Sequence, residues 1–340
     1  SSLIFGWSPG IAGADHPLLG DPALFFINNA PLTLDDVEGI LSIGIGTKPG
    51  DENAVGKFGL GMKSLFHLGE VFFYQAFDWH TASAKSDVFN PWDSYRPAWA
   101  EVSKQDKIRL EDEVRAITQN EGEGYFVVWV PLRSESIYLA RQDDENFIIV
   151  GEDYGHEVPD FISDPGLRDK LASLLPLMKT LQYIELVVKT GQEYQRQIHI
   201  SLPEKATRPL FTRLDGAGEW QGHITVHGIG SQSSQQKFYV GHEVLLNTPE
   251  FSALKSHRTW PFSYSREGKK TADKALPHAA VVMLAEKVPE GEATLTVEWA
   301  VFLPLGEQDT AQHAQKQTFP LSGQYSYQII LHGYFFIDAG

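Results

Sequence analysis

Glycine and lysine residues between positions 44 and 64 are the residues of this chain whose types and spacing best suit chemistry. Two glycine groups flank a short polar loop, and the second leads into an apolar helix that begins near Met62. The start of a helix presents unpaired backbone N–H groups and the positive end of its dipole, which attract an anion. Glycine lets a phosphate approach the backbone, and lysines add positive charge. The pattern therefore predicts a polyphosphate site formed by Gly44, Gly46, Thr47, Lys48, Gly56, Lys57, Phe58, Gly59, Leu60, Gly61, Met62, Lys63 and Ser64.

Two common phosphate-binding motifs are excluded. A P-loop has four residues between its first glycine and the Gly-Lys pair, whereas five separate Gly50 from Gly56, and Phe58 stands where the magnesium-binding Ser or Thr belongs. A dinucleotide-binding fingerprint fails as well, because Ser64 takes the place of its third glycine. The glycines must therefore belong to a different kind of nucleotide loop.

The segment resembles the nucleotide site of the GHKL ATPases, a superfamily that includes gyrase and the ninety-kilodalton heat-shock chaperones. Within it, the chain is most similar to the sacsin-like ATPases of bacteria. Six pieces follow one another in the family's order and span most of the chain. They are HPLLGDPALFFINNAPLT (16–33), SIGIGTK (42–48), GKFGLGMKSLFHLGEVFFY (56–74), GYFVVWVPLRS (124–134), VFLPLGE (301–307) and LHGYFFIDAG (331–340).

The resemblance implies a site for ATP with bound Mg²⁺. It puts Asn28 or Asn29 at the position of the aspartate that accepts a hydrogen bond from the adenine amino group. It makes residues 44–48 the turn beneath adenine and ribose, residues 49–55 a lid, and residues 56–64 the cradle for the phosphates.

Two substitutions within this site depart from the family pattern. An asparagine accepts from adenine through its amide oxygen, but its NH2 group cannot accept and faces the base unfavourably. One mispaired buried hydrogen bond costs about 1 to 3 kcal/mol, or about ten- to a hundredfold in affinity, so weak nucleotide binding is expected. Tyr125 stands where relatives have a threonine near the adenine, and its ring would either crowd the pocket or stack on the base.

A whole motif of the family is also missing from the sequence. In relatives, a helix before the first strand carries a glutamate that orients the attacking water and an asparagine that holds magnesium, and here no glutamate precedes Glu38. Either the chain begins downstream of that helix, or the protein is a degenerate ATPase. The start Ser-Ser-Leu-Ile-Phe enters a strand directly, which favours the first explanation. Catalytic residues are therefore not assigned, and ATP hydrolysis is expected only of a full-length protein.

The fold class predicted from the resemblance and from the element pattern is an α/β (α+β) two-layer sandwich of the GHKL or Bergerat type. In it, helices cover one face of a mixed sheet. This domain is expected to span residues 1–205 without its N-terminal helix. A second, strand-rich α+β domain is expected at residues 206–340 and is expected to continue beyond the chain end.

Individual elements are predicted from hydrophobic patterns and from turn residues. A helix is expected at residues 164–181, started by Asp164 and Pro165, and an insertion loop at residues 79–107. The strands expected in the first domain are 3–7, 71–77, 107–110, 125–132, 183–189 and 194–202. Those expected in the second are 223–227, 237–246, 279–286, 293–305 and 325–337.

Composition limits the partners and the location of the protein. With 44 acidic against 28 basic residues, the net charge of -16 disfavours binding to a nucleic-acid backbone. Residues 258–270 form a basic, aromatic cluster that could bind nucleic acid, pack on its own domain, or sense the nucleotide phosphate. The absence of cysteine excludes disulfides, and no apolar run long enough for a transmembrane helix occurs. A cytoplasmic location is expected.

The resemblance favours an ATP-binding conformational switch with a chaperone-like or defence-related role. Lid closure over the nucleotide, dimerisation on binding and slow hydrolysis are expected of it. The alternative is a non-hydrolysing scaffold or protein-interaction module of the same fold, in which the departures at Asn28, Asn29 and Tyr125 have closed the pocket. The sequence does not identify the protein client or effector.

Overall fold

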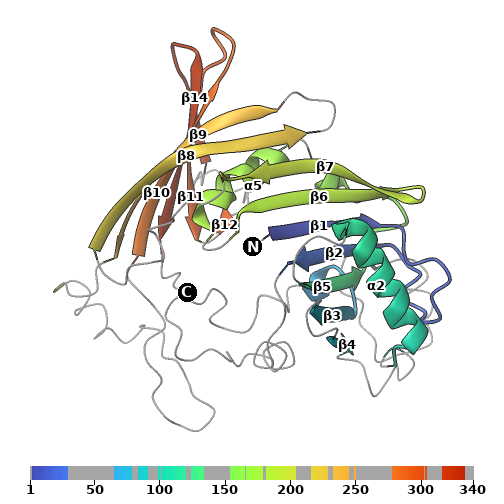
Figure 1. Ribbon diagram of the computed structural model, residues 1–340. Helices are drawn as coiled ribbons and strands as arrows, with labels where there is room; N and C mark the ends of the chain where they lie inside the picture. Colours follow the sequence, from blue (N-terminus) through green and yellow to red (C-terminus); the bar gives the residue numbers. More distant parts are fainter. Residues whose placement is uncertain are drawn as a thin grey trace, which may run out of the picture. The chain divides into compact units, whose positions relative to one another are not determined.

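The computed structural model of this chain contains two compact units, each assembled from separate segments (Figure 1). The first comprises Ser1–Thr47, Phe58–Leu167 and Ile184–Ile198, and the second comprises Lys48–Lys57, Arg168–Tyr183 and His199–Gly340. The structure describes residues 2–29, 65–78, 83–90, 99, 101–119, 124–133, 154–164, 166–178, 181–203, 216–228, 233–244, 249, 278–301, 303–304 and 316–333.

The first unit is built on a sheet in which the strands follow the order β7-β6-β1-β2-β5-β3-β4. Its strands are β1 (Ser2–Ser8), β2 (Ala23–Asn28), β3 (Phe72–Asp78), β4 (Ser83–Phe89), β5 (Gly124–Pro131), β6 (Tyr183–Thr190) and β7 (Glu193–Ser201). Strand β2 pairs with β1 and β5, and β3 pairs with β5 and β4, all antiparallel. These strands confirm most of the predictions for this region, and β2 and β4 were not predicted.

One face of this sheet, here called the α2 face, lies beneath helix α2 (Lys104–Thr118). Phe25 of β2 stacks on Trp129 of β5 there, with ring centroids 5.7 Å apart. The guanidinium of Arg115 in α2 lies 5.5 Å from the ring of Phe77 in β3. The ammonium of Lys189 in β6 donates to Glu113 of α2 at 2.6 Å. A cation–π contact with β3 and an ion pair with β6 therefore attach the helix to the sheet.

The opposite face, here called the turn face, is covered by shorter segments. Its buried residues include Trp7, Leu24, Leu132, Leu186, Phe72, Val128 and Val130. Ile162 of α4 (Asp160–Ser163) packs on one part of this face. Leu65, Phe66 and Leu68, which lie in the turn formed by residues 65–70, pack on another part.

These observations show that the predicted two-layer α/β sandwich is wrong. Strands dominate the described residues, with fourteen strands against three α-helices. In the first unit, moreover, helical segments lie on both faces of the sheet, so no layer of helices is confined to one face. The reason is that β5 is buried along both of its sides, and a strand of this kind must be covered twice.

Helix α2 corrects two further predictions. Residues 107–110 were expected to form a strand and lie inside α2, while the predicted insertion loop at 79–107 contains β4 and the start of α2. The buried residues Leu110, Val114 and Ile117 recur at intervals of four and three, which is the period of a helix and not of a strand. The Ser103 hydroxyl accepts from the Asp106 N–H at 3.0 Å and begins the helix.

The second unit is described mainly by strands in the order β12-β11-β14-β10-β9-β8, with β13 paired to β11. They are β8 (Gly216–Gly228), β9 (Ser234–Val244), β10 (His278–Lys287), β11 (Thr294–Val301), β12 (Leu303–Pro304), β13 (Lys316–Pro320) and β14 (Tyr325–Gly333). Strands β11 and β14 are parallel. Phe238, Val240, Val282, Leu284 and Ile330 are buried in this unit.

The helix predicted at residues 164–181 is shorter than expected. The Asp164 carboxylate accepts from the Gly166 N–H at 2.8 Å, and α5 (Leu167–Leu174) follows. Pro176 lacks an N–H for an α-helical bond, and the chain there forms the 3-10 helix η3 (Leu175–Leu177). Helix α5 therefore begins at Leu167, after the predicted start at Asp164, and ends at Leu174, well before the predicted end at Leu181.

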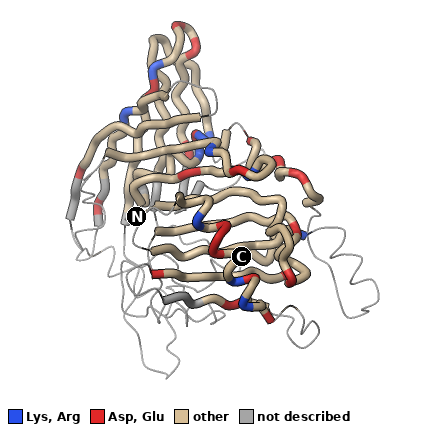
Figure 2. The backbone as a smooth tube through the Cα atoms, turned by 45° about the vertical axis from the view of Figure 1, so that its right-hand side comes forward, with Lys and Arg blue, Asp and Glu red and all other residues tan. Residues whose placement is uncertain are grey.

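The described residues offer no helix that is both long and apolar enough to cross a membrane. Figure 2 shows long uncharged stretches in the strands, with charged residues toward strand ends and in connections, and helix α2 is rich in charged residues as well.

The close approach of β1 to β6 predicts the effect of a substitution at Gly6. A Cβ added to Gly6 of β1 would lie 1.7 Å from the Val187 carbonyl oxygen of β6. We expect Gly6→Ala to lower the free energy of unfolding by about 2 kcal/mol or more, because the backbone of one strand must move. Urea unfolding followed by circular dichroism measures this. Gly20→Ala is the control, since a Cβ there meets no atom within 4 Å. Equal midpoints for both variants would contradict the close approach.

Candidate functional site

Most of the predicted nucleotide-binding residues lie outside the described residues. This holds for Gly44, Gly46, Thr47, Lys48 and all of Gly56 to Ser64. Asn28, Asn29 and Tyr125 can be placed, as can the turn of residues 65–70 that directly follows Ser64.

Asn28 is the last residue of β2 and lies on the turn face. It is paired with Leu3 of β1 and with Phe126 of β5. Directly opposed residues in antiparallel strands point to the same side of the sheet, so Asn28 shares its face with Phe126. Phe126 in turn packs in the cluster that contains Leu65 and Phe66. The two ends of the segment that holds the predicted phosphate residues therefore meet the same face of one sheet.

The Asn29 side chain forms a structural hydrogen bond. Its side-chain Oδ1 accepts a hydrogen bond from the backbone N–H of Ser2 at 2.9 Å, which ties the end of β2 to the start of β1. Of the two asparagines that the sequence left as alternatives for the adenine contact, Asn28 is the one that lies opposite Phe126 on the turn face.

Tyr125 lies on the α2 face and is buried. Its ring stacks on Phe77 with centroids 5.9 Å apart. Burial raises the pKa of the Tyr125 hydroxyl far above its ordinary value, and the Glu111 carboxylate raises it further. The structure therefore does not bring Tyr125 together with Asn28, since alternate residues of β5 point to opposite faces. The residue of β5 that shares a face with Asn28 is Phe126.

Sequence reasoning missed a buried ion pair that holds the turn of residues 65–70. The Arg133 Nε donates to Glu70 Oε1 at 2.7 Å, and its two terminal nitrogens donate to the backbone carbonyls of Phe66 and His67. Glu70 and Arg133 are 4% and 9% exposed. The available signal was chemical, because an arginine directly after a fully apolar strand has to find a partner if it is buried.

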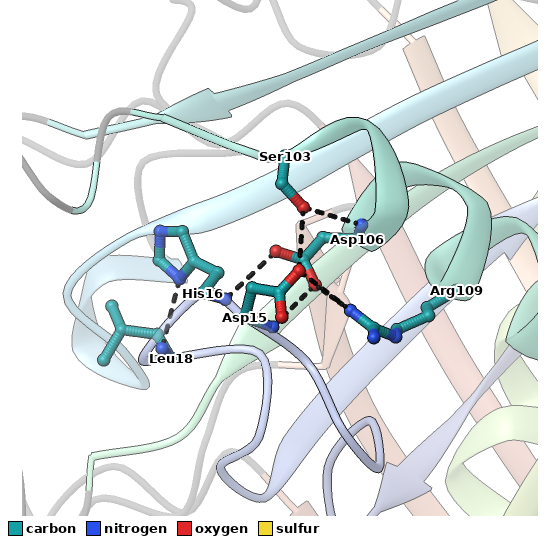
Figure 3. A network of polar contacts seen from close by, with 6 residues as sticks. All are labelled: Asp15, His16, Leu18, Ser103, Asp106 and Arg109. Carbon is teal, nitrogen blue, oxygen red and sulfur yellow. Dashed lines mark hydrogen bonds and ion pairs between the residues drawn. The ribbon is translucent and has the colours of Figure 1, made fainter.

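A second polar network joins the loop before β2 to the start of α2 (Figure 3). The Asp106 carboxylate accepts from the backbone N–H groups of Asp15 at 2.8 Å and His16 at 3.0 Å. Arg109 donates to Asp106 and to Asp15, both at 3.1 Å. Burial alone would raise the pKa of Asp106, but these hydrogen bonds together with Ser103 hold the pKa below its usual value.

His16 is fully occupied by structural hydrogen bonds. Its Nδ1 accepts from the Leu18 N–H at 3.1 Å, which leaves Nε2 to donate to the Trp99 carbonyl at 3.1 Å. Burial lowers the pKa of His16, and the Trp99 bond and the Asp106 charge offset this only in part. Because both ring nitrogens are used and the ring is neutral, His16 stabilises the loop and is not placed to transfer a proton.

The described residues do not assemble a catalytic centre of their own. No group of three or more His, Asp or Glu side chains among them is arranged to hold a metal ion. What they provide is a scaffold: the end of β2 with Asn28, the turn held by Arg133, and the loop held by Asp106.

The similarities to known proteins fall in the same part of the chain. Residues 12–128 match the family model described as the Sacsin domain. This part of the chain resembles sacsin. The human (Homo sapiens) protein named Sacsin is 48% identical over 52 residues, which are 15% of this chain and 1% of that relative. The chain therefore spans a very small part of the curated relative that it matches. The Sacsin-domain match begins in the loop of His16 and ends within β5.

The network around Asp106 predicts a pH-dependent stability. We expect Asp106→Asn to lower the free energy of unfolding by about 2 kcal/mol at pH 7, because a neutral amide cannot satisfy two N–H groups and Arg109. The folded pKa of Asp106 lies below the ordinary value of 3.8, so this stabilisation is present above about pH 4 and is lost as the pH falls through the folded pKa. The difference between the variant and the natural protein should therefore shrink in acid.

Urea unfolding at pH 7 and pH 3 measures this difference. Asp15→Asn is the matched control, because the Asp15 side chain is 61% exposed and its removal should change stability by only about 0.5 kcal/mol. A difference between Asp106→Asn and the natural protein that is the same at both pH values would contradict the assigned role of the carboxylate.

Proposed function

We propose that this chain binds Mg-ATP as part of a conformational switch related to sacsin. The observation that carries the proposal is the Sacsin-domain match over residues 12–128, which includes every predicted nucleotide-binding residue. The geometry supports it, because Asn28 and the turn of residues 65–70 meet the same face of the sheet. Segments on one face of a sheet can contact the same nucleotide.

In the proposed complex, Asn28 contacts the adenine and residues 56–64 hold the phosphates. The amide oxygen of Asn28 accepts from the adenine amino group, and Phe126 lies on the same face, where its ring can pack against the base. The glycines and the helix start supply backbone N–H groups to the phosphates. Mg²⁺ would neutralise charge on the bound phosphates.

The proposed activity is nucleotide binding and switching, and no residue of this chain is proposed to catalyse hydrolysis. No glutamate precedes Glu38 in this sequence, so the family's water-orienting glutamate has no counterpart there. We propose that lid closure over the nucleotide changes which surfaces are exposed and promotes dimerisation, as in a chaperone-like or defence-related ATPase. Client recognition would follow from that change.

A scaffold without nucleotide is the second candidate. The asparagine at the aspartate position favours it, because the neutral amide is a poorer partner for adenine. The buried position of Tyr125 does not favour it, since a side chain beneath α2 cannot close a pocket on the turn face. The two candidates differ in one measurable property, which is affinity for Mg-ATP.

Calorimetry with Mg-ATP on this chain tests the proposal. We expect weak binding, and we expect Asn28→Asp to tighten it about tenfold by restoring a carboxylate acceptor. Asn29→Asp is the matched control and should leave the affinity unchanged, because Asn29 Oδ1 is occupied by Ser2. Gly61→Glu should abolish binding by placing a carboxylate among the phosphates.

The outcomes separate the two candidates. No binding up to millimolar Mg-ATP would contradict the switch and leave the scaffold. Equal binding of ATP and GTP would argue against a specific adenine contact at Asn28.

A further inference from the structure

We infer that one face of the second unit's sheet is the surface on which two copies of this chain associate, with the strands of one copy antiparallel to those of the other. This face carries Val281 of β10 and is here called the open face. It is independent of the proposed nucleotide site, because all the residues that form it lie in strands β8 to β14.

Exposed hydrophobic side chains gather on the open face. The described residues expose five large hydrophobic side chains, and three of these are Val281 at 45%, Phe319 at 47% and Tyr325 at 51%. Single exposed hydrophobic residues are ordinary on a protein surface, but several on one surface indicate an interface. Strand register decides whether these three form one surface.

The register puts Phe319 and Tyr325 on one side of the sheet. Phe319 of β13 is paired with Leu295 of β11, and Leu295 is paired with Tyr327 of β14. Paired residues of neighbouring strands point to the same side, and so do residues two apart within one strand. Tyr325 therefore shares this side with Tyr327, Leu295 and Phe319.

Val281 belongs to the same side. It is paired with Leu331 of β14, which lies four residues after Tyr327. The next residue, Val282, points the other way, and both Val282 and its partner Ile330 are buried. One side of the sheet is therefore covered, while the open face exposes apolar side chains.

The basic residues of the open face lie at one end of it. On β10, Ala285 and Lys287 lie four and six residues after Val281 and therefore share its side. Ala285 is paired with Lys237 of β9. The Lys237 ammonium lies 4.7 Å from the centroid of the Tyr239 ring on the same side. Both lysines are exposed, and they make this end of the face positive.

The acidic residues of the open face lie at its opposite end. Glu243 comes six residues after Lys237 on β9, so it points to the same side. Glu219 of β8 is paired with Gly241, two residues before Glu243. Both glutamates are exposed. The acidic residues of the connection 288–293 lie beyond the strands, outside this face. The face is therefore negative at one end and positive at the other, with apolar side chains between.

This charge pattern identifies a second copy of the chain as the partner. Two sheets pack face to face about 10 Å apart, and a two-fold interface joins the same surface of both copies. When the strands are antiparallel, the glutamates of each copy lie near the lysines of the other. Chains with a net charge of -16 repel one another, so association needs a surface on which opposite charges meet. Burial of the apolar side chains between the two ends supplies the main stabilisation.

Sedimentation velocity of this chain without nucleotide tests the inference. We expect dimers at about 100 µM protein, and we expect Val281→Glu to raise the dissociation constant of the dimer about tenfold or more, because a carboxylate would be buried among apolar side chains in both copies. Ile108→Glu is the matched control, since Ile108 of α2 is 42% exposed and lies outside the open face. This control should leave the dissociation constant unchanged.

An exchange of charges tests the antiparallel arrangement. Glu219→Lys and Lys237→Glu should each weaken association about threefold or more, because each places like charges near one another across the interface. The double variant has the natural net charge and should restore the dissociation constant to within about twofold of its natural value.

Three results would overturn the inference. A monomer at every concentration up to about 100 µM would do so and would leave the open face to a different partner. A dimer that tolerates Val281→Glu, or a double variant that associates no better than the single charge variants, would do so as well. If Val281→Glu does not fold by circular dichroism, the charge variants decide, because Glu219 and Lys237 are both exposed. Since no nucleotide is added, none of these results bears on Mg-ATP binding.

Discussion

Burial of β5 on both of its sides is the constraint on which the described part of the first unit depends. Tyr125, Val127 and Trp129 are fully buried on the α2 face, while Val128, Val130 and Leu132 are buried on the turn face. A strand that is apolar on both sides needs two covers, and removing either would expose large aromatic and branched side chains to water. Helix α2 provides one cover, and the turn of residues 65–70 with α4 provides the other. The buried polar groups of these covering segments have hydrogen-bond partners close by in the fold, as Asp106 and Arg133 do.

The strands of this sheet were predictable because their signals are local. Alternating or continuous runs of Val, Ile, Phe and Trp indicated β1, β3, β5, β6 and β7 to within a few residues. Helix α2 was not predicted, because its apolar residues are few and its sequence is rich in charge. The cap at Ser103 with the helical spacing of Leu110 and Val114 was the available signal. The predicted one-sided helix layer failed because β5 is apolar on both of its sides and is covered on both.

The candidate site shows which positions sequence similarity predicted and which it did not. The resemblance placed Asn28, Asn29 and Tyr125 beside one adenine, whereas strand pairing places Asn28 with Phe126 on one face and Tyr125 on the other. A residue's face follows from register, which a single sequence does not reveal. The ion pair between Arg133 and Glu70 could not be predicted either, since Glu70 lies 63 residues away in the chain. In both cases, the folded structure supplied spatial information that the sequence motif lacks.

Amide hydrogen exchange of the full chain with and without Mg-ATP tests the account most directly. Nucleotide binding at the turn face predicts slower exchange in peptides that cover the end of β2, residues 44–64 and the turn of residues 65–70. It predicts no change in α2, which covers the opposite face. Protection confined to α2, or no protection anywhere at millimolar Mg-ATP, would contradict nucleotide binding at the turn face.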